Sequence, residues 1–231
     1  MVGTVAVVIP ARNEADRIQD TVRAAAGLPD VGAVVVVDDG SSDATAGNAK
    51  EAGAAVMRHS RNRGKGAAME TGAEAVQLLD QQEGLASPRH LLFLDADLGE
   101  TAARAAPLMR PVLAGQADMT IAVFTATVKL GGHGLVVKLS GRGIRRATGW
   151  QPRQPLNGQR CLTRAAFEAA RPLARGFGVE TALTIDLLRK GMRITEVEVD
   201  LAHRATGTDL HAQLHRARQL ADVALALATR R

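Results

Sequence analysis

Apolar and polar positions follow two patterns along the first half of the chain. Short apolar runs, typical of buried strands, are followed by longer stretches in which apolar residues recur every three or four positions, as in amphipathic helices. The runs predict strands at residues 4–10, 33–38, 54–58, 90–95 and 119–124. The stretches between them predict helices at residues 14–26, 43–52, 64–79 and 101–114. Strands that alternate with helices are typical of βαβ units, so we expect an α/β fold with a mostly parallel sheet flanked by helices.

The pattern becomes less regular after residue 124. A group of glycines predicts a loop at 131–134, and a basic amphipathic stretch follows over residues 135–148. Two prolines end that stretch, because proline cannot continue a helix. Further elements are expected as a helix from residue 163, a helix at 180–190, a strand at 192–199 and a helix at 209–228. No repeat or linker separates the two halves, so we expect a single domain over residues 1–231.

The composition excludes several classes of protein. Aromatic residues make up 2% of the chain and Tyr is absent, so binding of nucleic acid by base stacking is disfavoured. A single cysteine, Cys161, permits neither an internal disulfide nor a cysteine-based zinc site. No apolar run reaches the roughly 18 residues that a membrane span needs, and the early first strand leaves no room for a signal peptide. We therefore expect a cytoplasmic protein without transmembrane segments.

Charge is distributed unevenly along the chain. The first half is net acidic and the second half is strongly basic. Acidic residues are absent between Asp118 and Glu168, where the basic residues are Lys129, Lys138, Arg142, Arg145, Arg146, Arg153, Arg160 and Arg164. Such a stretch favours an anionic ligand, and a merely solvated basic surface is the alternative.

Polar residues follow three of the predicted strands, and in open α/β sheets ligands bind beyond the carboxyl ends of strands. The first strand ends in Pro10-Ala11-Arg12-Asn13-Glu14, the second in Asp38-Asp39, and the fourth in the triplet Asp95-Ala96-Asp97. These carboxylates would repel each other unless a cation or a hydrogen-bonded ligand lay among them. The triplet suits Mg²⁺ or Mn²⁺ bound against substrate phosphates, and a turn that caps the next helix is the alternative.

Two neighbouring segments extend this prediction. Asp38 and Asp39 could accept hydrogen bonds from a ribose or a base, or belong to a turn in which Ser41, Ser42 and Asp43 are candidate helix caps. The segment RNRGKG at 61–66 places glycines and cations near a helix N-terminus, which suits a phosphate. It lacks the Walker A spacing, and no G-x-G-x-x-G follows the first strand, which disfavours P-loop ATPases and dinucleotide dehydrogenases.

The ordered motifs VVIPARNEA, VVVVDDGSSDAT, RNRGKGAA and LLFLDADLG resemble the nucleotide-binding half of family 2 type glycosyltransferases with the GT-A fold, over about residues 4–124. The resemblance implies a nucleotide-sugar-binding half at 1–124 and an acceptor-binding half at 125–231. It also implies a role for each motif. The base and ribose would be held by Pro10, Ala11, Arg12, Asn13, Glu14, Asp38 and Asp39. The diphosphate and its Mg²⁺ or Mn²⁺ would be held by Gly64, Lys65, Gly66, Asp95, Ala96 and Asp97.

The second half contains SGRG, QPLNGQRCLTR, GFGVETALTIDLLRKG and VDLAHRATGTDLHAQLHRARQ, which are similar to segments of glucosyl-3-phosphoglycerate synthases. This similarity implies that Gly141 and Arg142 contact an acceptor phosphate and that His203 completes the metal site with Asp95 and Asp97. Gly158 and the turn that ends in Glu180 would border the substrates. Two positions depart from the pattern: Ile144 replaces a hydroxyl residue and Ala205 replaces an asparagine.

The expected function is metal-dependent transfer of a hexose from a UDP-glucose-like donor to an anionic, phosphorylated acceptor such as 3-phosphoglycerate. Lys65, Asp97 and Glu180 are the expected catalytic residues, with Glu180 acting as base if transfer inverts the sugar and as a positioning group if it retains it. The alternatives are a polyprenyl-phosphate glycosyltransferase, a sugar nucleotidyltransferase and a non-catalytic nucleotide-sugar-binding protein. A lipid-phosphate acceptor, contact with a membrane surface and a homodimer stay open.

Overall fold

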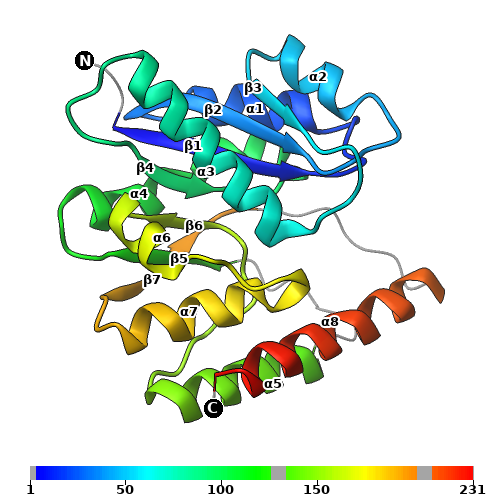
Figure 1. The fold of residues 1–231 in the computed structure, drawn as a ribbon, viewed down its shortest axis with the longest axis vertical. Helices are drawn as coiled ribbons and strands as arrows, with labels where there is room; N and C mark the ends of the chain where they lie inside the picture. Colours follow the sequence, from blue (N-terminus) through cyan, green and yellow to red (C-terminus); the bar gives the residue numbers. More distant parts are fainter. Residues whose placement is uncertain (1–3, 126–133, 202–209, 231) are drawn as a thin grey trace.

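The computed structural model describes residues 4–125, 134–201 and 210–230, without the side chains of 210–218. These residues form a seven-stranded sheet of order β3-β2-β1-β4-β6-β5-β7 (Figure 1). The strands are β1 (Val5–Ala11), β2 (Val31–Asp38), β3 (Ala55–Arg58), β4 (His90–Phe93), β5 (Met119–Phe124), β6 (Arg160–Leu162) and β7 (Ile194–Val199). Only β6 runs antiparallel to its neighbours, β4 and β5. The predicted mostly parallel α/β sheet is confirmed.

Helices cover both faces of the sheet. One face packs against α1 (Ile18–Ala26), α2 (Thr45–Glu51), the 3₁₀ helix η1 (Gly99–Ala105) and α4 (Ala106–Leu113). The other face packs against α3 (Lys65–Gln82), α6 (Arg164–Ala170) and α7 (Val179–Arg189). Side chains of β1 alternate between the two cores, as the strand period requires: Val7 and Ile9 enter one core and Val8 enters the other. A Cβ on Gly72 of α3 would collide with Val8, so this glycine lets the helix lie directly on the sheet.

Two further helices lie beyond α7, at the lower end of the molecule in Figure 1. These are α5 (Gly134–Thr148) and α8 (Leu210–Ala228), which pack against each other and against α7. The 3₁₀ turn η2 (Gly176–Gly178) leads directly into α7 and also touches α8. In the part of the chain that the structure describes, no helix is long and apolar enough to cross a membrane.

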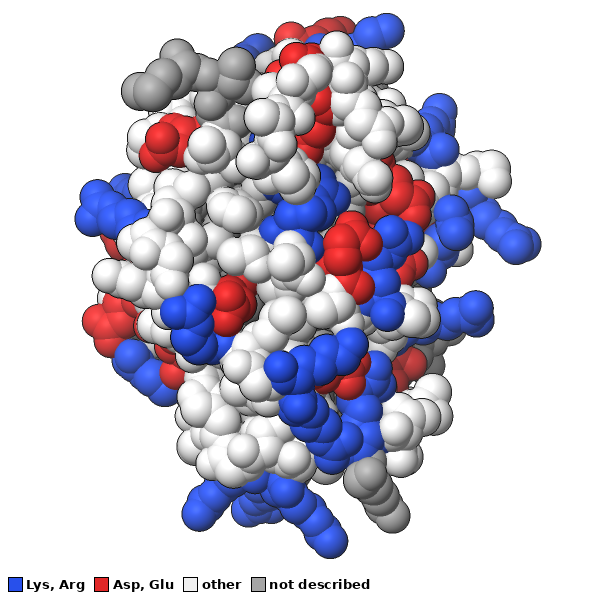
Figure 2. Space-filling model, turned by 60° about the vertical axis from the view of Figure 1, so that its left-hand side comes forward, with Lys and Arg blue, Asp and Glu red and all other residues white. Residues whose placement is uncertain are grey.

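The basic segment is divided between surface and core. Exposed cations of α5 are Lys138, Arg142, Arg145 and Arg146, and Lys and Arg side chains project from the same lower end in Figure 2. Arg160 and Arg164, in contrast, are only 1% and 9% exposed. These two side chains are therefore not part of the basic surface that could attract an anionic ligand. Lys129 lies outside the described residues.

The local structure differs from the sequence analysis in three places. The helix expected at 101–114 is split into η1 and α4, because Pro107 at the start of α4 has no N–H to donate to the preceding turn. β6 was not expected, since three residues are too few to show an alternating pattern. The N-cap of α2 is Ala44, without a side-chain cap; Asp43 instead accepts from the first helical N–H, that of Thr45, at 3.0 Å.

Candidate active site

The loops after β1 and β2 are held together by hydrogen bonds. Asn13 N–H donates to Ser41 Oγ at 2.9 Å, and Ser42 N–H donates to Asn13 Oδ1 at 2.9 Å. Glu14 N–H donates to Thr45 Oγ1 at 2.8 Å. Asn13 has a φ of 56°, in the left-handed region that asparagine tolerates better than most residues. Asn13 and Glu14, in the motif VVIPARNEA, thus tie the loop after β1 to the loop after β2. Arg12 is exposed, whereas Pro10 and Ala11 belong to β1 itself.

The two aspartates after β2 are buried and have partners within the protein. Asp38 accepts from Ser41 N–H at 2.8 Å and lies 3.1 Å from Arg58 Nε. Asp39 accepts from the N–H groups of Arg63 and Gly64, at 2.7 and 2.8 Å. Asp39 therefore anchors the loop that presents the following lysine. Contact of either aspartate with a ribose or a base stays a prediction.

Lys65 lies between two carboxylates that come from different elements. Its Nζ is 2.7 Å from Asp95 Oδ1, after β4, and 3.0 Å from Glu180 Oε1, in the first turn of α7. Burial favours the neutral amine, but the charges of Asp95 and Glu180 outweigh it and raise the pKa of Lys65 above its usual range. The lysine therefore carries a stable positive charge at the carboxyl end of the sheet. Three predicted site residues are brought together here.

Gly158 and Gln159, the two residues before β6, complete this cluster. Gln159 is fully buried, and its Nε2 donates to Asp95 Oδ2 at 2.7 Å. A Cβ on Gly158 would collide with Lys65 Nζ and lie 3.0 Å from Asp95 Oδ1. Sequence reasoning missed Gln159, because β6, which brings it beside Asp95, was not expected. Gly158 was predicted from the motif, and the structure supplies its physical reason.

Gly158→Ala is therefore expected to push Lys65 away from Asp95 and to lower by about a hundredfold the rate of any reaction that depends on this lysine, since misplacing a catalytic group by about 1 Å costs on that order. Steady-state kinetics would measure the loss. The control is Gly47→Ala, whose added methyl group lies in open space within α2. Gly149→Ala is less suitable, because a φ of 78° at Gly149 would strain any other residue. Unchanged activity in Gly158→Ala would contradict the assigned role.

The tip of β4 is held through its backbone. Thr21 Oγ1 of α1 donates to the carbonyl of Ala96 at 2.8 Å, and Arg17 Nη1 donates to the carbonyl of Asp97 at 3.2 Å. The Asp97 side chain is half-buried. These contacts fix the position of the triplet through its backbone carbonyls. The alternative in which the triplet caps a helix is not seen, since the N-cap of η1 is Leu98.

Arg160 lies beneath the cluster as a fully buried guanidinium. It donates to the carbonyls of Asn157, Pro155 and Glu180 and to the Thr184 hydroxyl, at 2.9 to 3.0 Å. Burial lowers the pKa of Arg160 to about 10, which still leaves it charged at neutral pH. This cation supports the first turn of α7, from which Glu180 reaches Lys65. Nothing in the sequence pattern distinguished Arg160 from the surface cations around it.

A cavity of about 210 Å³ opens next to the lysine cluster. Its lining residues are Lys65, Asp95, Val136, Leu156, Phe177, Glu180, Gln219 and Val223. The wall therefore has a charged side, built from β4, α3 and α7, and a more apolar side, built from α5, η2 and α8. Gly141 and Arg142 lie further along α5, with Gly141 buried near Gln151 and Arg142 exposed. They are not among the described residues that line this cavity.

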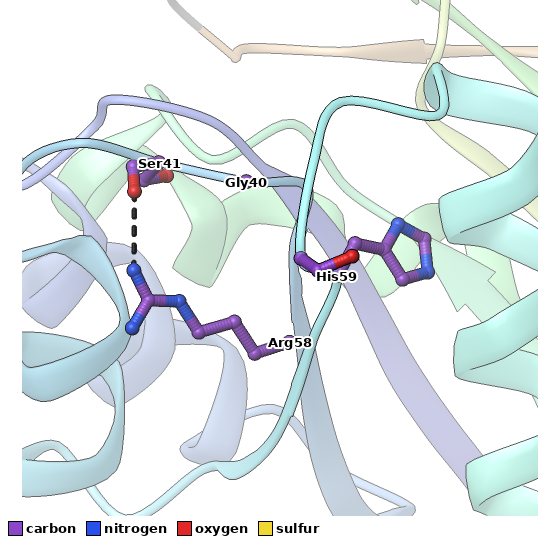
Figure 3. Close-up of a pocket in the computed structure, with 5 residues that line it drawn as sticks. Gly40, Ser41, Arg58 and His59 are labelled. Atoms are coloured by element: carbon purple, nitrogen blue, oxygen red, sulfur yellow. Dashed lines mark hydrogen bonds between the residues drawn. The ribbon is translucent and has the colours of Figure 1, made fainter.

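A second cavity, of about 340 Å³, lies at the β2–β3 edge of the sheet and is lined by Gly40, Ser41, Arg58, His59 and Ser60. Figure 3 shows Arg58 extended toward the Ser41 carbonyl, to which it donates at 3.2 Å. The His59 ring points away from these two groups, toward Asp39 and Thr71. This cavity is larger, but the carboxylates and the lysine of the predicted site line the smaller one.

The donor set at the tip of β4 fits a hard divalent cation. Mg²⁺ is usually bound by one or two carboxylates together with substrate phosphates, which matches Asp95 and Asp97. The described residues contain no group of three acidic, histidine or cysteine side chains that could hold a metal by itself. The predicted third ligand, His203, lies outside the described residues, so its role stays a prediction.

Comparisons with known proteins agree with this geometry. Over 211 residues the chain is 31% identical to "Glycosyltransferase AglJ" of Haloferax volcanii, covering 89% of this chain and 65% of that protein. It is 37% identical over 117 residues to an uncharacterized protein of Methanocaldococcus jannaschii, covering 50% of this chain and 44% of that one. The chain thus spans less than two thirds of the length of these relatives.

Solved structures of glucosyl-3-phosphoglycerate synthase from Mycobacterium tuberculosis are similar over nearly the whole chain. The complex with phosphoglyceric acid superposes with a TM-score of 0.76 at 27% identity, covering 98% of this chain and 79% of that one. The complex with Mn²⁺, UDP and phosphoglyceric acid gives 0.75 at 26% identity, covering 97% and 78%. The predicted GT-A type fold is confirmed. "Glycosyl transferase family 2" matches residues 6–153, more than half of the sequence, and the chain belongs to this family.

Proposed function

We propose that this protein transfers a hexose from a UDP-sugar to an anionic, phosphorylated acceptor, with 3-phosphoglycerate as the first acceptor to test. The observation that carries the proposal is Lys65 held between Asp95 and Glu180 in a cavity at the carboxyl end of the sheet. Residues 1–124 would bind the nucleotide-sugar and residues 125–231 the acceptor. The neighbouring structures with UDP and phosphoglyceric acid support this choice of substrates.

Cleavage of a nucleotide-sugar builds negative charge on the leaving diphosphate, so groups that stabilise this charge accelerate the reaction. Lys65 is a preorganised cation for that task, because two carboxylates and Gly158 fix its ammonium group. Asp95 and Asp97, with His203 as third ligand, would hold Mg²⁺ or Mn²⁺. The bound ion would supply Lewis-acid neutralisation of the diphosphate.

Glu180 borders the same cavity with one oxygen already paired to Lys65. We infer that Glu180 orients the sugar or the acceptor while it holds the lysine in place. This is the role expected of Glu180 if transfer retains the configuration of the sugar. Exposed cations on α5, among them Arg142, supply positive potential for an acceptor phosphate approaching from that side. Ile144, where the related synthases have a hydroxyl residue, is fully buried in α5, so the acceptor phosphate would depend on other groups.

Removal of the divalent ion gives the first test. In a transfer assay with UDP-glucose and 3-phosphoglycerate, we expect EDTA to abolish product formation and excess Mn²⁺ or Mg²⁺ to restore it. The reason is that the lysine alone cannot neutralise a diphosphate that carries more than one charge. Undiminished transfer in EDTA would contradict the metal role. If product forms with a polyprenyl phosphate and not with 3-phosphoglycerate, the lipid-phosphate alternative is correct.

A further inference from the structure

Helix α8 lines the same cavity as the lysine cluster. Gln219 and Val223, one turn apart on the same face of α8, line the cavity together with Lys65 and Glu180. Gln219 is the last residue of the segment VDLAHRATGTDLHAQLHRARQ, but the sequence analysis predicted no role for it. This face of α8 therefore belongs to the site although the site prediction from the sequence did not include it.

The position of α8 is determined by the turn that precedes α7. Asp222 Oδ2 accepts from Phe177 N–H at 2.9 Å. Gly176 has a φ of 65°, and a Cβ there would collide with the Asp222 carboxylate. A Cβ on Gly178 would lie only 2.6 Å from the carbonyl oxygen of Asp222 and 2.7 Å from Ala226 Cβ. The glycines of η2 thus let α8 approach closely, which places Gln219 against the cavity.

Gln219 Oε1 is buried and has no hydrogen-bond partner among the described residues. A buried amide oxygen without a partner costs about 1–3 kcal/mol, so such a group in a native protein points to a partner that a ligand supplies. A carbonyl oxygen can only accept. Phosphate and carboxylate groups at neutral pH offer acceptors alone, so the matching ligand group is a hydroxyl or an N–H.

We propose that Gln219 binds a hydroxyl group of the donor hexose and thereby selects the sugar. This inference rests on the proposed function. Lys65 and Asp95 mark the diphosphate end of the cavity, and the group bonded directly to a nucleotide-sugar diphosphate is the sugar. The apolar part of the wall, from Val136, Phe177 and Val223, suits the C–H faces of a sugar ring, while Gln219 and Glu180 offer oxygen acceptors for its hydroxyls.

The test compares wild type with Gln219→Leu, which keeps the size of the side chain and removes the acceptor. With UDP-glucose we expect kcat/KM to fall about thirtyfold, in line with one lost hydrogen bond to a buried group. Binding of UDP with Mn²⁺ is expected to stay unchanged, because UDP lacks the hexose. The melting temperature is expected to stay equal or rise, because the substitution removes a polar atom that has no partner in the protein.

Deoxy analogues of UDP-glucose identify the hydroxyl. One of them should lower wild-type kcat/KM to the level of Gln219→Leu and be transferred equally by both proteins. Leu220→Ala, on the exposed side of α8, is the matched control and should leave the kinetics unchanged. Equal kcat/KM of wild type and Gln219→Leu with UDP-glucose would overturn this inference alone. The inference would also be overturned if Gln219→Leu lost the same factor in kcat/KM relative to wild type with every analogue. A clear drop in the melting temperature of Gln219→Leu would overturn it too, because either result indicates a structural role. Failure of the wild type to bind UDP would overturn the proposed function and this inference with it.

Discussion

Asp97→Asn is expected to lower hexose transfer by about a thousandfold, because a metal ion at a developing charge contributes several kcal/mol to transition-state stabilisation. The substitution keeps the shape of the side chain and removes the charge that an ion needs. The backbone contacts of Thr21 and Arg17 with the triplet do not involve this carboxylate. The fold should therefore be retained, because these backbone contacts hold the triplet in place.

The measurement is initial-rate kinetics with saturating Mn²⁺, together with thermal unfolding of the same preparation. Glu100→Gln is a matched control, since Glu100 is an exposed carboxylate three residues further on, at the start of η1. It should transfer hexose like the wild type. Full activity of Asp97→Asn would contradict the proposal that the triplet binds a divalent ion, whatever the activity of the control.

Lys65→Met is expected to lower transfer by at least a hundredfold and also to destabilise the protein. The substitution removes the cation and leaves Asp95 and Glu180 facing each other across the space that its ammonium group occupied. Two carboxylates so close favour uptake of one proton by the pair. The loss of stability should therefore be large at pH 8 and smaller at pH 5, where protonation relieves the repulsion.

The sign follows from linkage. In the variant the folded state binds a proton more readily than the unfolded state does, so its stability relative to wild type decreases as pH rises. Thermal unfolding at the two pH values measures the difference, and Lys50→Met, at an exposed position of α2, is the control with no such dependence. A melting temperature unaffected by Lys65→Met at both pH values would show that the ammonium does not hold the two carboxylates together.

The sequence predicted the site in outline because its chemistry follows the ends of strands. Lys65 and Asp95 lie in segments that βαβ topology brings to one edge of the sheet, and they are 2.7 Å apart in the structure. The sequence analysis expected a bound cation or ligand to relieve the repulsion among the aspartates, but groups of the protein itself already contact them. Arg58, the loop N–H groups and Lys65 supply partners within the protein for Asp38, Asp39 and Asp95.

What the sequence could not predict depends on packing across long chain separations. Gln159 reaches Asp95 only because the short strand β6 is inserted antiparallel beside β4. Gln219 reaches the cavity only because α8 packs on the glycines of η2. Neither contact leaves a periodic signal in the chain. The burial of Arg160 could not be predicted either, because a fully buried arginine and a surface arginine cannot be told apart in the sequence.

We propose that the tip of β4 binds the diphosphate of a nucleotide-sugar through Asp97 and a divalent ion. Calorimetric titration of UDP into wild type and Asp97→Asn, each with and without Mn²⁺, tests it most directly. We expect tight binding only for wild type with Mn²⁺ and weak binding in the other three cases. Binding of UDP to Asp97→Asn that is as tight and as Mn²⁺-dependent as in wild type would contradict it.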